Sequence, residues 1–300
     1  MTTQSLRLGF IGLGIMGTPM AGHLLRAGHE LFAHSASSVP AGVLAAGAKA
    51  CASAKEVAQQ ADIVFIMVPD TPHVGDVLFG ENGVAAGIGK GKIVVDMSSI
   101  SPLETKVYAK KVNALGCDFL DAPVSGGEVG AKNATLSIMV GGSEDDFAAA
   151  KPILDLVGKT IVHVGSNGAG QTVKAANQLI VAGNIELLAE AITFLQAYDV
   201  DIDAAIKVLG GGLAGSAVLD QKAPKMLARN FDPGFRIALH HKDLGIVTAA
   251  AREAGVVTPL GSLVAQLMAS ALANGEGGLD HSALLLGVER LSGKESGAGQ

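Results

Sequence analysis

The stretch Leu6-Arg-Leu-Gly-Phe-Ile-Gly-Leu-Gly-Ile-Met-Gly17 predicts the architecture of the first half of this chain. Its apolar beginning, Leu6–Ile11, is typical of a buried strand, and a helix-compatible segment, Pro19–Ala27, follows the glycines. A strand, a glycine-rich turn and a helix in this order form the fingerprint of dinucleotide-binding proteins. We therefore expect a dinucleotide to bind here, and a purely structural glycine turn is the alternative.

Each glycine of the turn has its own physical task. Gly12 permits a sharp turn, Gly14 lets a pyrophosphate approach the backbone, and Gly17 lets the helix pack closely against the strand. The helix N-terminus then offers unpaired N–H groups and the positive end of its dipole to the phosphates. The residues of the turn that we expect to bind the cofactor are Gly12, Leu13, Gly14, Ile15, Met16 and Gly17.

Short apolar runs alternate with helix-compatible segments through the rest of the first half. Most runs are rich in β-branched residues and lack strict alternation, which is typical of strands buried on both faces of a parallel sheet. The pattern predicts an α/β fold with a Rossmann-type, doubly wound sheet. The expected strands are Leu6–Ile11, Leu31–Ala33, Ile63–Val68, Ile93–Asp96, Phe119–Asp121, Leu136–Val140 and Ile161–Val164.

The pattern changes after about Gly165. A segment without proline, from about Gln171 to Tyr198, is apolar enough to form a long, largely buried helix. Further helical stretches follow around Ile202–Leu209, Lys242–Ala254 and Leu260–Ala273, and no convincing strand run appears beyond residue 165. We therefore expect two domains joined by the long helix: a dinucleotide-binding Rossmann domain over residues 1–165, and an all-helical substrate and oligomerisation domain over residues 166–300.

The composition argues against several classes of protein. The chain has 22 basic and 28 acidic residues, a net charge of −6 and no long basic run, so we expect no nucleic-acid partner. Cys51 and Cys117 form no CxxC pair and cannot supply a four-cysteine zinc site. The uncharged stretch between Arg7 and Arg26 is interrupted by glycines and a proline, so we expect no membrane or targeting segment. We expect both cysteines to be reduced, mostly buried thiols of a cytoplasmic protein.

The end of the second expected strand bears on the choice of cofactor. Proteins that bind NAD place a carboxylate there for the ribose hydroxyls. Here Glu30 begins the strand, and His34 and Ser35 occupy the expected position. Since that position holds neither a carboxylate to repel a 2′-phosphate nor an arginine to bind one, both NAD and NADP remain open. We expect Ser35 to contact the cofactor.

Two further motifs suggest chemistry. Asp121-Ala-Pro-Val-Ser-Gly-Gly127 follows an expected strand, and its Ser-Gly-Gly turn suits an anion such as a carboxylate, with an ordinary turn as the alternative. Lys174, Asn177 and Gln178 have the spacing that places them on one helix face. Because the neighbours of Lys174 are apolar, a desolvated lysine that donates or accepts a proton is the hypothesis, against a surface lysine.

With these motifs in place, the chain resembles the β-hydroxyacid dehydrogenase family, which includes the 3-hydroxyisobutyrate dehydrogenases. The resemblance covers nearly the whole chain. Many relatives have Asn four residues after the lysine, whereas this chain has Gln178 there and Asn177 one place earlier, which leaves open which amide contacts substrate. The matching segments are Gly9–Gly17, Asp96–Ile100, Asp121–Gly127 and Lys174 with its helix face; Lys174–Gln178, Gly211–Ser216, Val218–Pro224, Arg229–Ile237 and Lys242–Leu244 are similar to the branch that reduces tartronate semialdehyde.

The resemblance implies a role for each motif. Lys174 would be the general acid in reduction and the base in oxidation. The turn of Ser125, Gly126 and Gly127 would hold the substrate carboxylate, and Asn177 or Gln178 would orient the substrate. The further residues that would contact the cofactor or line its site are Val68, Pro69, Ser98 or Ser99, and Lys242.

The same resemblance implies an NAD(P)-dependent reduction of a small aldehyde acid, with tartronate semialdehyde giving D-glycerate as the first choice. 3-Hydroxyisobutyrate, succinic semialdehyde and glyoxylate are the alternative substrates. An imine reductase is disfavoured by Lys174, and a non-catalytic dinucleotide-binding module is the alternative from another class.

His240 and His241 would point apart on a helix with no ligand cluster nearby, so we expect no metal site. The long apolar helix indicates a homodimer or homotetramer.

Overall fold

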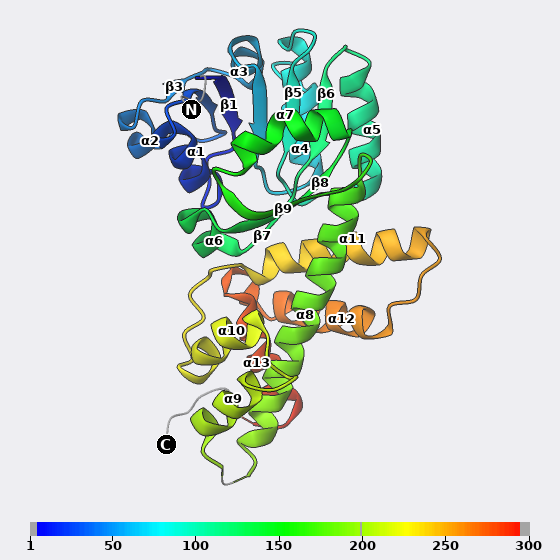
Figure 1. Ribbon diagram of the computed structural model, residues 1–300. Helices are drawn as coiled ribbons and strands as arrows, with labels where there is room; N and C mark the ends of the chain where they lie inside the picture. The colour runs from blue at the N-terminus through cyan, green and yellow to red at the C-terminus, as the bar shows by residue number, and fades with distance from the viewer. Residues whose placement is uncertain (1–4, 199, 295–300) are drawn as a thin grey trace. The chain divides into compact units, whose positions relative to one another are not determined.

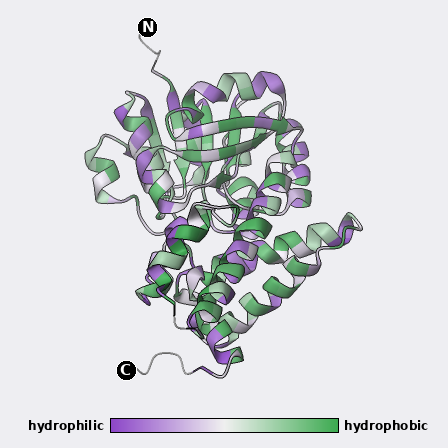
Figure 2. Ribbon diagram, turned by 60° about the horizontal axis from the view of Figure 1, so that its bottom comes forward, coloured by the Kyte–Doolittle hydropathy of each residue, from purple (hydrophilic) through white to green (hydrophobic). Residues whose placement is uncertain are grey.

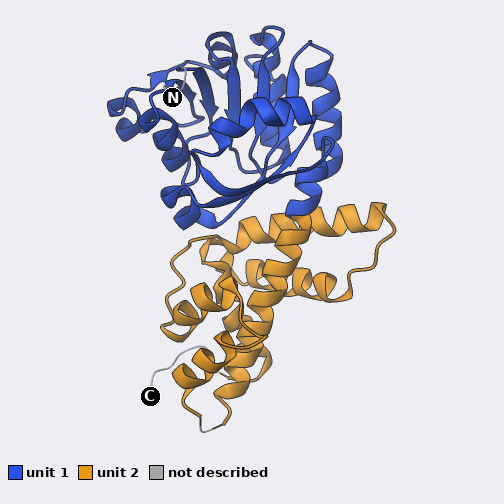
Figure 3. Ribbon diagram, viewed as in Figure 1, with its two compact units in different colours: residues 1–174 blue, residues 175–300 orange. Residues whose placement is uncertain are grey.

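The computed structural model describes residues 5–198 and 200–294, and it divides the chain into two compact units, residues 1–174 and 175–300 (Figure 3). Unit 1 carries the β-sheet, and unit 2 is helical (Figure 1). The boundary between the units falls inside α8 (Ala169–Leu195), so one continuous helix belongs to both. In the described part of unit 2, strand pairing is limited to an isolated bridge between Arg236 and Asp280.

Unit 1 is built on one nine-stranded sheet with the order β3-β2-β1-β4-β5-β6-β8-β7, and β9 pairs with β8. All neighbours from β3 to β6 are parallel, which confirms the expected doubly wound α/β sheet. The strands are β1 (Arg7–Ile11), β2 (Glu30–His34), β3 (Lys49–Ala50), β4 (Ile63–Ile66), β5 (Ile93–Asp96), β6 (Asp118–Asp121), β7 (Val124–Ser125), β8 (Leu136–Gly141) and β9 (Gly158–Gly165).

The far side of the sheet departs from an all-parallel arrangement. β8 runs antiparallel to β6 and β7, and parallel to β9. The chain changes direction after β7 at Gly126 and Gly127, whose φ angles of 131° and 61° are readily adopted only by glycine. The connection that reverses the chain between β7 and β8 runs through α6 (Gly127–Asn133), and it begins with the Ser-Gly-Gly segment that the sequence indicates for substrate binding.

The strands of unit 1 have cores on both faces. In β4, Ile63 and Phe65 belong to one buried cluster and Val64 and Ile66 to the other, as expected from the alternation of side chains along a strand. Figure 2 shows hydrophobic residues along these strands, and both hydrophobic and hydrophilic residues on the helices. The first cluster is covered by α1 (Gly17–Arg26), α2 (Ala41–Ala45), α6 (Gly127–Asn133) and α7 (Glu144–Leu154), and the second by α3 (Ala54–Gln60), α4 (Thr71–Phe79) and α5 (Pro102–Asn113).

Unit 2 packs its helices around α8. Ile185, Leu188 and Ile192 of α8 lie in a buried cluster with Leu244 of α11 and Met268 of α12. Three short 3₁₀ turns occur in the described chain: η1 (Val84–Ala86) in unit 1, and η2 (Glu276–Gly278) and η3 (His281–Ala283) in unit 2. The other helices of unit 2 are α9 (Ile202–Gly210), α10 (Ala217–Leu227), α11 (Ile237–Glu253), α12 (Pro259–Ala273) and α13 (Leu284–Leu291).

The length and composition of α8 would also allow it to cross a membrane, and within the described residues it is the one helix for which this holds. Half of its most apolar 18-residue window is buried inside the structure. The buried face includes Ala182, Ile185 and Ala189, which form part of the unit 2 core. This packing accounts for the apolar character of that face without a membrane.

Candidate active site

The candidate cofactor residues of unit 1 gather at one edge of its sheet. β1, β2, β4, β5 and β6 are parallel, so their carboxyl ends meet there. The strand order reverses between β1 and β4, and nucleotides bind at such a switch point in open α/β sheets. The residues that follow these strands are Gly12–Gly17 after β1, Ser35 after β2, Val68 and Pro69 after β4, and Ser98 and Ser99 after β5.

The glycine turn between β1 and α1 has the geometry that its sequence predicts. Gly12 has a φ of 96°, and its N–H donates to the His34 carbonyl over 3.0 Å. A Cβ added at Gly17 would lie 2.0 Å from the Gly12 carbonyl oxygen and 3.0 Å from the Phe10 ring, so only glycine fits. A Cβ on Gly14 would meet nothing within 4 Å. The missing side chain at Gly14 therefore leaves open space beside the backbone at the N-terminus of α1, as a bound pyrophosphate requires.

Ser98 connects three of the segments at this edge. Its N–H donates to Asp96 Oδ1 over 3.0 Å, and its Oγ accepts from the Val68 N–H over 3.0 Å. The side-chain amide of Gln171 donates to the Ser98 carbonyl over 2.7 Å. Ser98 is 1% exposed and Ser99 is half-buried, so the first serine serves the structure of the edge and the second lies nearer its surface.

Asp121, the last residue of β6, anchors the beginning of α8. Its buried carboxylate accepts from the Gly168 N–H at 2.8 Å and from the Gln171 N–H at 3.0 Å. Burial raises the pKa of Asp121, and the hydrogen bonds from these two backbone amides oppose that rise. Gln171 also accepts from the Ile100 N–H over 3.1 Å. The first turn of α8 is thus fixed to the ends of β5 and β6 by buried polar contacts.

Lys174 lies one turn after Gln171 and is only 8% exposed. Val173 beside it on the helix is 38% exposed, so the lysine occupies the inner side of α8 at this point. Lys174 is thus buried one turn after the residues that anchor α8 to the ends of β5 and β6, and a buried ammonium group is suited to proton transfer. No local sequence pattern indicates the roles of Asp121 and Gln171, the two residues that set the position of this turn.

The Ser-Gly-Gly turn lies at the antiparallel side of the sheet. Ser125 is half-buried in β7 and is in register with Ser137 of β8. Gly126 is exposed and precedes the first residue of α6, Gly127. The turn therefore offers a hydroxyl group and main-chain amides without side chains at the start of a helix, a combination that suits a carboxylate.

In unit 2, α8 and α11 hold a second polar group. The Asn177 amide donates to Gln178 Oε1 over 2.8 Å, and Gln178 Nε2 donates to Asp243 Oδ2 over 2.5 Å. Lys242 Nζ lies 2.9 Å from Asp243 Oδ1. Gln178 is 5% exposed and Asn177 is half-buried. Asp243 is 3% exposed and connects the predicted residues Gln178 and Lys242. The sequence pattern does not indicate this role, because the partner of Asp243 on α8 is 65 residues away.

The adjacent histidines of α11 have different surroundings. His240 is fully buried and faces His281, with 2.9 Å between their Nδ1 atoms, whereas His241 is half-buried. In the part of the chain that the structure describes, no group of three or more His, Cys, Asp or Glu side chains could hold a metal ion. His240 is therefore a partner in a side-chain network.

Two family models match the chain in succession. Residues 7–165 match the NAD binding domain of 6-phosphogluconate dehydrogenase, and residues 168–287 match the NAD-binding domain of NADP-dependent 3-hydroxyisobutyrate dehydrogenase. These models and the glycine turn agree that the cofactor is NAD or NADP.

Individual relatives cover nearly the whole chain. The 2-hydroxy-3-oxopropionate reductase of Escherichia coli is 50% identical over 96% of this chain and 98% of its own, and the 2-(hydroxymethyl)glutarate dehydrogenase of Eubacterium barkeri is 38% identical over 99% of both. Among solved structures, Mycobacterium tuberculosis 3-hydroxyisobutyrate dehydrogenase with L-serine superposes with a TM-score of 0.86 at 32% identity, covering 94% of this chain and 99% of that one. The chain belongs to the 3-hydroxyisobutyrate dehydrogenase family of NAD(P)-dependent oxidoreductases, which act on the CH–OH group of hydroxy acids.

Proposed function

We propose that this enzyme reduces a small aldehyde acid, with tartronate semialdehyde giving D-glycerate as the first choice, and that Lys174 is its general acid. The observation that carries the proposal is the buried position of Lys174, one turn after Asp121 and Gln171 fix α8 to the strand ends. The substrate is supported by the relative at 50% identity, whose name, 2-hydroxy-3-oxopropionate reductase, refers to the same aldehyde acid.

The chemistry needs a proton at the oxygen of the reacting carbonyl. When bound, NADH or NADPH supplies the hydride that reduces the aldehyde carbon to a primary alcohol. Negative charge develops on the carbonyl oxygen, and the Lys174 ammonium donates a proton there. In the oxidation direction, the neutral amine accepts that proton from the alcohol. Because Lys174 is almost fully buried, water competes little for this transfer.

The other candidate residues bind and orient. The Ser125 hydroxyl and the main-chain amides of Gly126 and Gly127 would hold the substrate carboxylate. Of the two amides on α8, Gln178 is the better candidate for orienting the substrate, since its side chain is fixed by Asp243. The residues that would hold the cofactor or line its site are Gly12–Gly17, Ser35, Val68, Pro69, Ser98, Ser99 and Lys242.

The two parts of the chain would divide this work. We propose that residues 1–165 bind the dinucleotide and hold the substrate carboxylate at Ser125–Gly127. Residues 166–300 would serve substrate binding through Lys174 and Gln178, add the cofactor contact of Lys242, and provide the surface for self-association. The outer face of α8 supports a homodimer or homotetramer, because three large apolar residues seven positions apart are more than half exposed: Ile180, Leu187 and Phe194. Light scattering on the wild type and on Leu187→Glu tests this, and a monomeric wild type would contradict it.

The cytoplasm is the proposed location of the enzyme. Both cysteines, Cys51 and Cys117, are buried free thiols, as expected for a protein in a reducing compartment.

The substrate is tested by following NADH and NADPH consumption in parallel with tartronate semialdehyde, succinic semialdehyde, glyoxylate and methylmalonate semialdehyde, which is the oxidised form of 3-hydroxyisobutyrate. The largest kcat/KM should belong to tartronate semialdehyde. A larger kcat/KM for another acid would identify that acid as the substrate and leave the proposed reaction class unchanged. Tight cofactor binding without consumption in any assay would favour a non-catalytic dinucleotide-binding module.

The role of Lys174 is tested by Lys174→Ala, with the exposed Lys159→Ala as a matched control. Removing a general acid should lower kcat by ~10²-fold or more. The dissociation constant for NAD(P)H should stay close to that of the wild type, because Lys174 is assigned to substrate chemistry. Near-normal turnover in Lys174→Ala would refute the assignment.

A further inference from the structure

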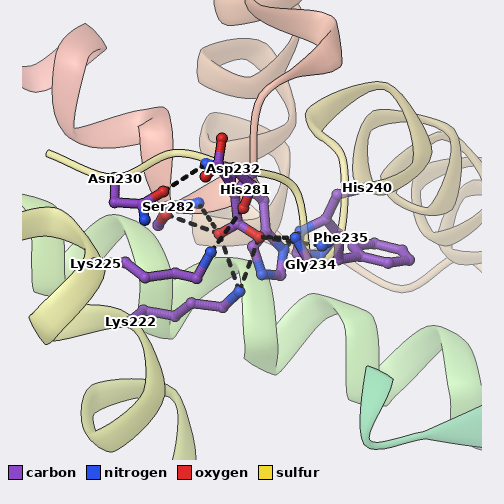
Figure 4. A network of polar contacts seen from close by, with 10 residues as sticks. Lys222, Lys225, Asn230, Asp232, Gly234, Phe235, His240, His281 and Ser282 are labelled. Atoms are coloured by element: carbon purple, nitrogen blue, oxygen red, sulfur yellow. Dashed lines mark hydrogen bonds and ion pairs between the residues drawn. The ribbon is translucent and has the colours of Figure 1, made fainter. Parts of the chain in front are cut away.

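Two histidines face each other in the interior of unit 2. His240 of α11 is 0% exposed and His281 of η3 is 5% exposed, and their Nδ1 atoms lie 2.9 Å apart. The Phe235 ring lies beside both, with centroid distances of 5.6 Å and 5.4 Å. Figure 4 shows the two imidazoles and Phe235 together beside the side chain of Lys222. Neither histidine has a role in the proposed reaction.

The contacts of the pair determine where its protons lie. His240 Nε2 is 3.2 Å from the main-chain carbonyl of Gln178, which can only accept, so Nε2 carries a proton. A neutral His240 then presents an unprotonated Nδ1, and His281 Nδ1 donates to it. The pair shares one bridging proton, because two protonated Nδ1 atoms would repel each other at 2.9 Å. Burial lowers the pKa of His281 well below its usual value, which favours the neutral pair.

His281 is held in place from its own side by an ionic cluster. The main-chain N–H of His281 donates to the main-chain carbonyl of Phe235 over 2.9 Å. The preceding residue, Asp280, is fully buried, pairs with Lys222 Nζ at 2.9 Å, and accepts from the Gly234 and Phe235 amides. The charged groups that influence the pair are therefore Asp280 and, from α10, Lys222 and Lys225. These contacts leave His281 little freedom to turn away from His240.

At the other end of the network, α11 contacts Gln178 at two points. His240 contacts its main-chain carbonyl, and Asp243, three residues later on the same helix, accepts from its side-chain amide over 2.5 Å. The spacing of three places His240 and Asp243 on one face of α11. The backbone and the side chain of one residue of α8 are thus both fixed by α11, and the backbone contact depends on the histidine pair.

We propose that the buried His240–His281 pair is a positioning device that holds Gln178 for the substrate, so that it sets the KM for the aldehyde acid without entering the chemical step. The proposal rests on the proposed function of Gln178 in orienting the substrate. A misplaced amide would weaken substrate binding, while the proton donor, Lys174, would keep its place on the part of α8 anchored by Asp121.

The first test compares His281→Phe with His281→Asn. Phenylalanine keeps an aromatic ring at this position but removes the Nδ1 donor to His240. The KM for the acid should therefore rise by ~10-fold, the loss expected for one buried hydrogen bond. The kcat and the dissociation constant for NAD(P)H should change by less than about threefold. Asparagine can place an amide N–H where Nδ1 lies, so His281→Asn should restore most of the KM. A matched control is His163→Phe, which removes a histidine-to-carbonyl contact of 2.8 Å in unit 1 and should leave KM unchanged.

A second pair of variants keeps the proposal testable if His281→Phe does not fold. His240→Gln retains a donor for the Gln178 carbonyl and needs no partner at His281, whereas His240→Leu removes the donor. The glutamine variant should keep a KM near the wild-type value and the leucine variant should raise it. Equal KM values in all folded variants, or a His281→Asn variant as impaired as His281→Phe, would overturn the proposal.

The outcome can be separated from a failure of the proposed function. The KM is measured with whichever acid of the substrate panel the wild type turns over fastest. A wrong substrate would change the ranking of the acids and leave the ratios between the histidine variants intact. A wrong role for the histidine pair would remove those ratios while the ranking stays the same.

Discussion

The sheet edge of unit 1 and the polar group on α8 and α11 of unit 2 hold their candidate functional groups by different means. At the sheet edge, Gly12, Gly14 and Gly17 act through what they lack, since a side chain would clash there or fill open space. In unit 2, Gln178 is held by side chains, with Asp243 on its amide and His240 on its carbonyl. The first arrangement depends on local backbone geometry, and the second depends on contacts between distant segments.

This difference predicts opposite responses to substitution. A new Cβ at the sheet edge should destabilise the fold where it would clash with the backbone, and weaken cofactor binding where it would fill open space. Truncation of a side chain in the unit 2 group should have a smaller, graded effect, because each substitution removes only that residue's own contacts from a connected set.

Gly17→Ala and Gly14→Ala should separate folding from cofactor binding. A Cβ at Gly17 would lie 2.0 Å from a backbone oxygen, so Gly17→Ala should destabilise unit 1 by ~3 kcal/mol. A Cβ at Gly14 meets nothing within 4 Å, so Gly14→Ala should melt like the wild type but bind NAD(P)H at least ~10-fold more weakly. Thermal melting and fluorescence titration with NAD(P)H measure the two effects. Wild-type cofactor affinity in Gly14→Ala would show that the pyrophosphate does not approach this turn.

Glu186 of α8 should make unit 2 sensitive to pH. Burial, together with Glu190 one turn further on, raises the pKa of its carboxyl from 4.5 to about 7. The folded protein therefore keeps a proton that the unfolded chain releases, so stability should fall as pH rises from about 4.5 to about 7, by up to ~3 kcal/mol. Above about pH 7 the loss is complete and this dependence levels off.

The variant Glu186→Gln should remove that dependence, because its amide does not titrate in this range. The exposed Glu190→Gln is the control and should keep most of it. Melting temperatures are compared at several pH values between about 5 and about 8. A Glu186→Gln variant whose stability changes with pH as steeply as that of the wild type would contradict the assignment.

Asp243→Ala should weaken substrate binding more than it slows the reaction. It removes the acceptor of the Gln178 amide and the partner of Lys242, so the KM for the acid should rise by ~10-fold. The exposed Asp220→Ala on α10 is the matched control. Steady-state kinetics decide the matter, and a fall in kcat at constant KM would indicate that Asp243 acts in the chemical step instead.

Local sequence patterns predict seven of the nine strands and the glycine turn, but they do not indicate the two-residue strands β3 and β7. The strand Leu6–Ile11 was predicted within one residue of β1, because an apolar run that ends at a glycine turn leaves few alternatives. The long helix expected over residues 171–198 occupies Ala169–Leu195. Its earlier start reflects the cap that Asp121 provides from β6, a contact across 47 residues that no local pattern reveals.

Features that depend on distant partners were not predictable in the same way. The helix expected from Lys242 begins at Ile237, next to Arg236, which bridges to Asp280. The sequence predicts β8 as a strand, but its antiparallel direction depends on the connection through α6, which begins at Gly126 and Gly127. Likewise, the pairing of His240 with a histidine 41 residues away could not be read from the adjacent His240 and His241.

Chemical rescue shows whether the Lys174 ammonium delivers the proton to the reacting oxygen. In Lys174→Ala, small primary amines such as methylamine and ethylamine should restore turnover in proportion to their concentration, because they can replace the missing proton donor. The same amines should leave the wild type and Lys159→Ala unaffected. Full turnover of Lys174→Ala without amine would contradict the account, and so would a lost turnover that no amine restores although the variant is folded and binds NAD(P)H.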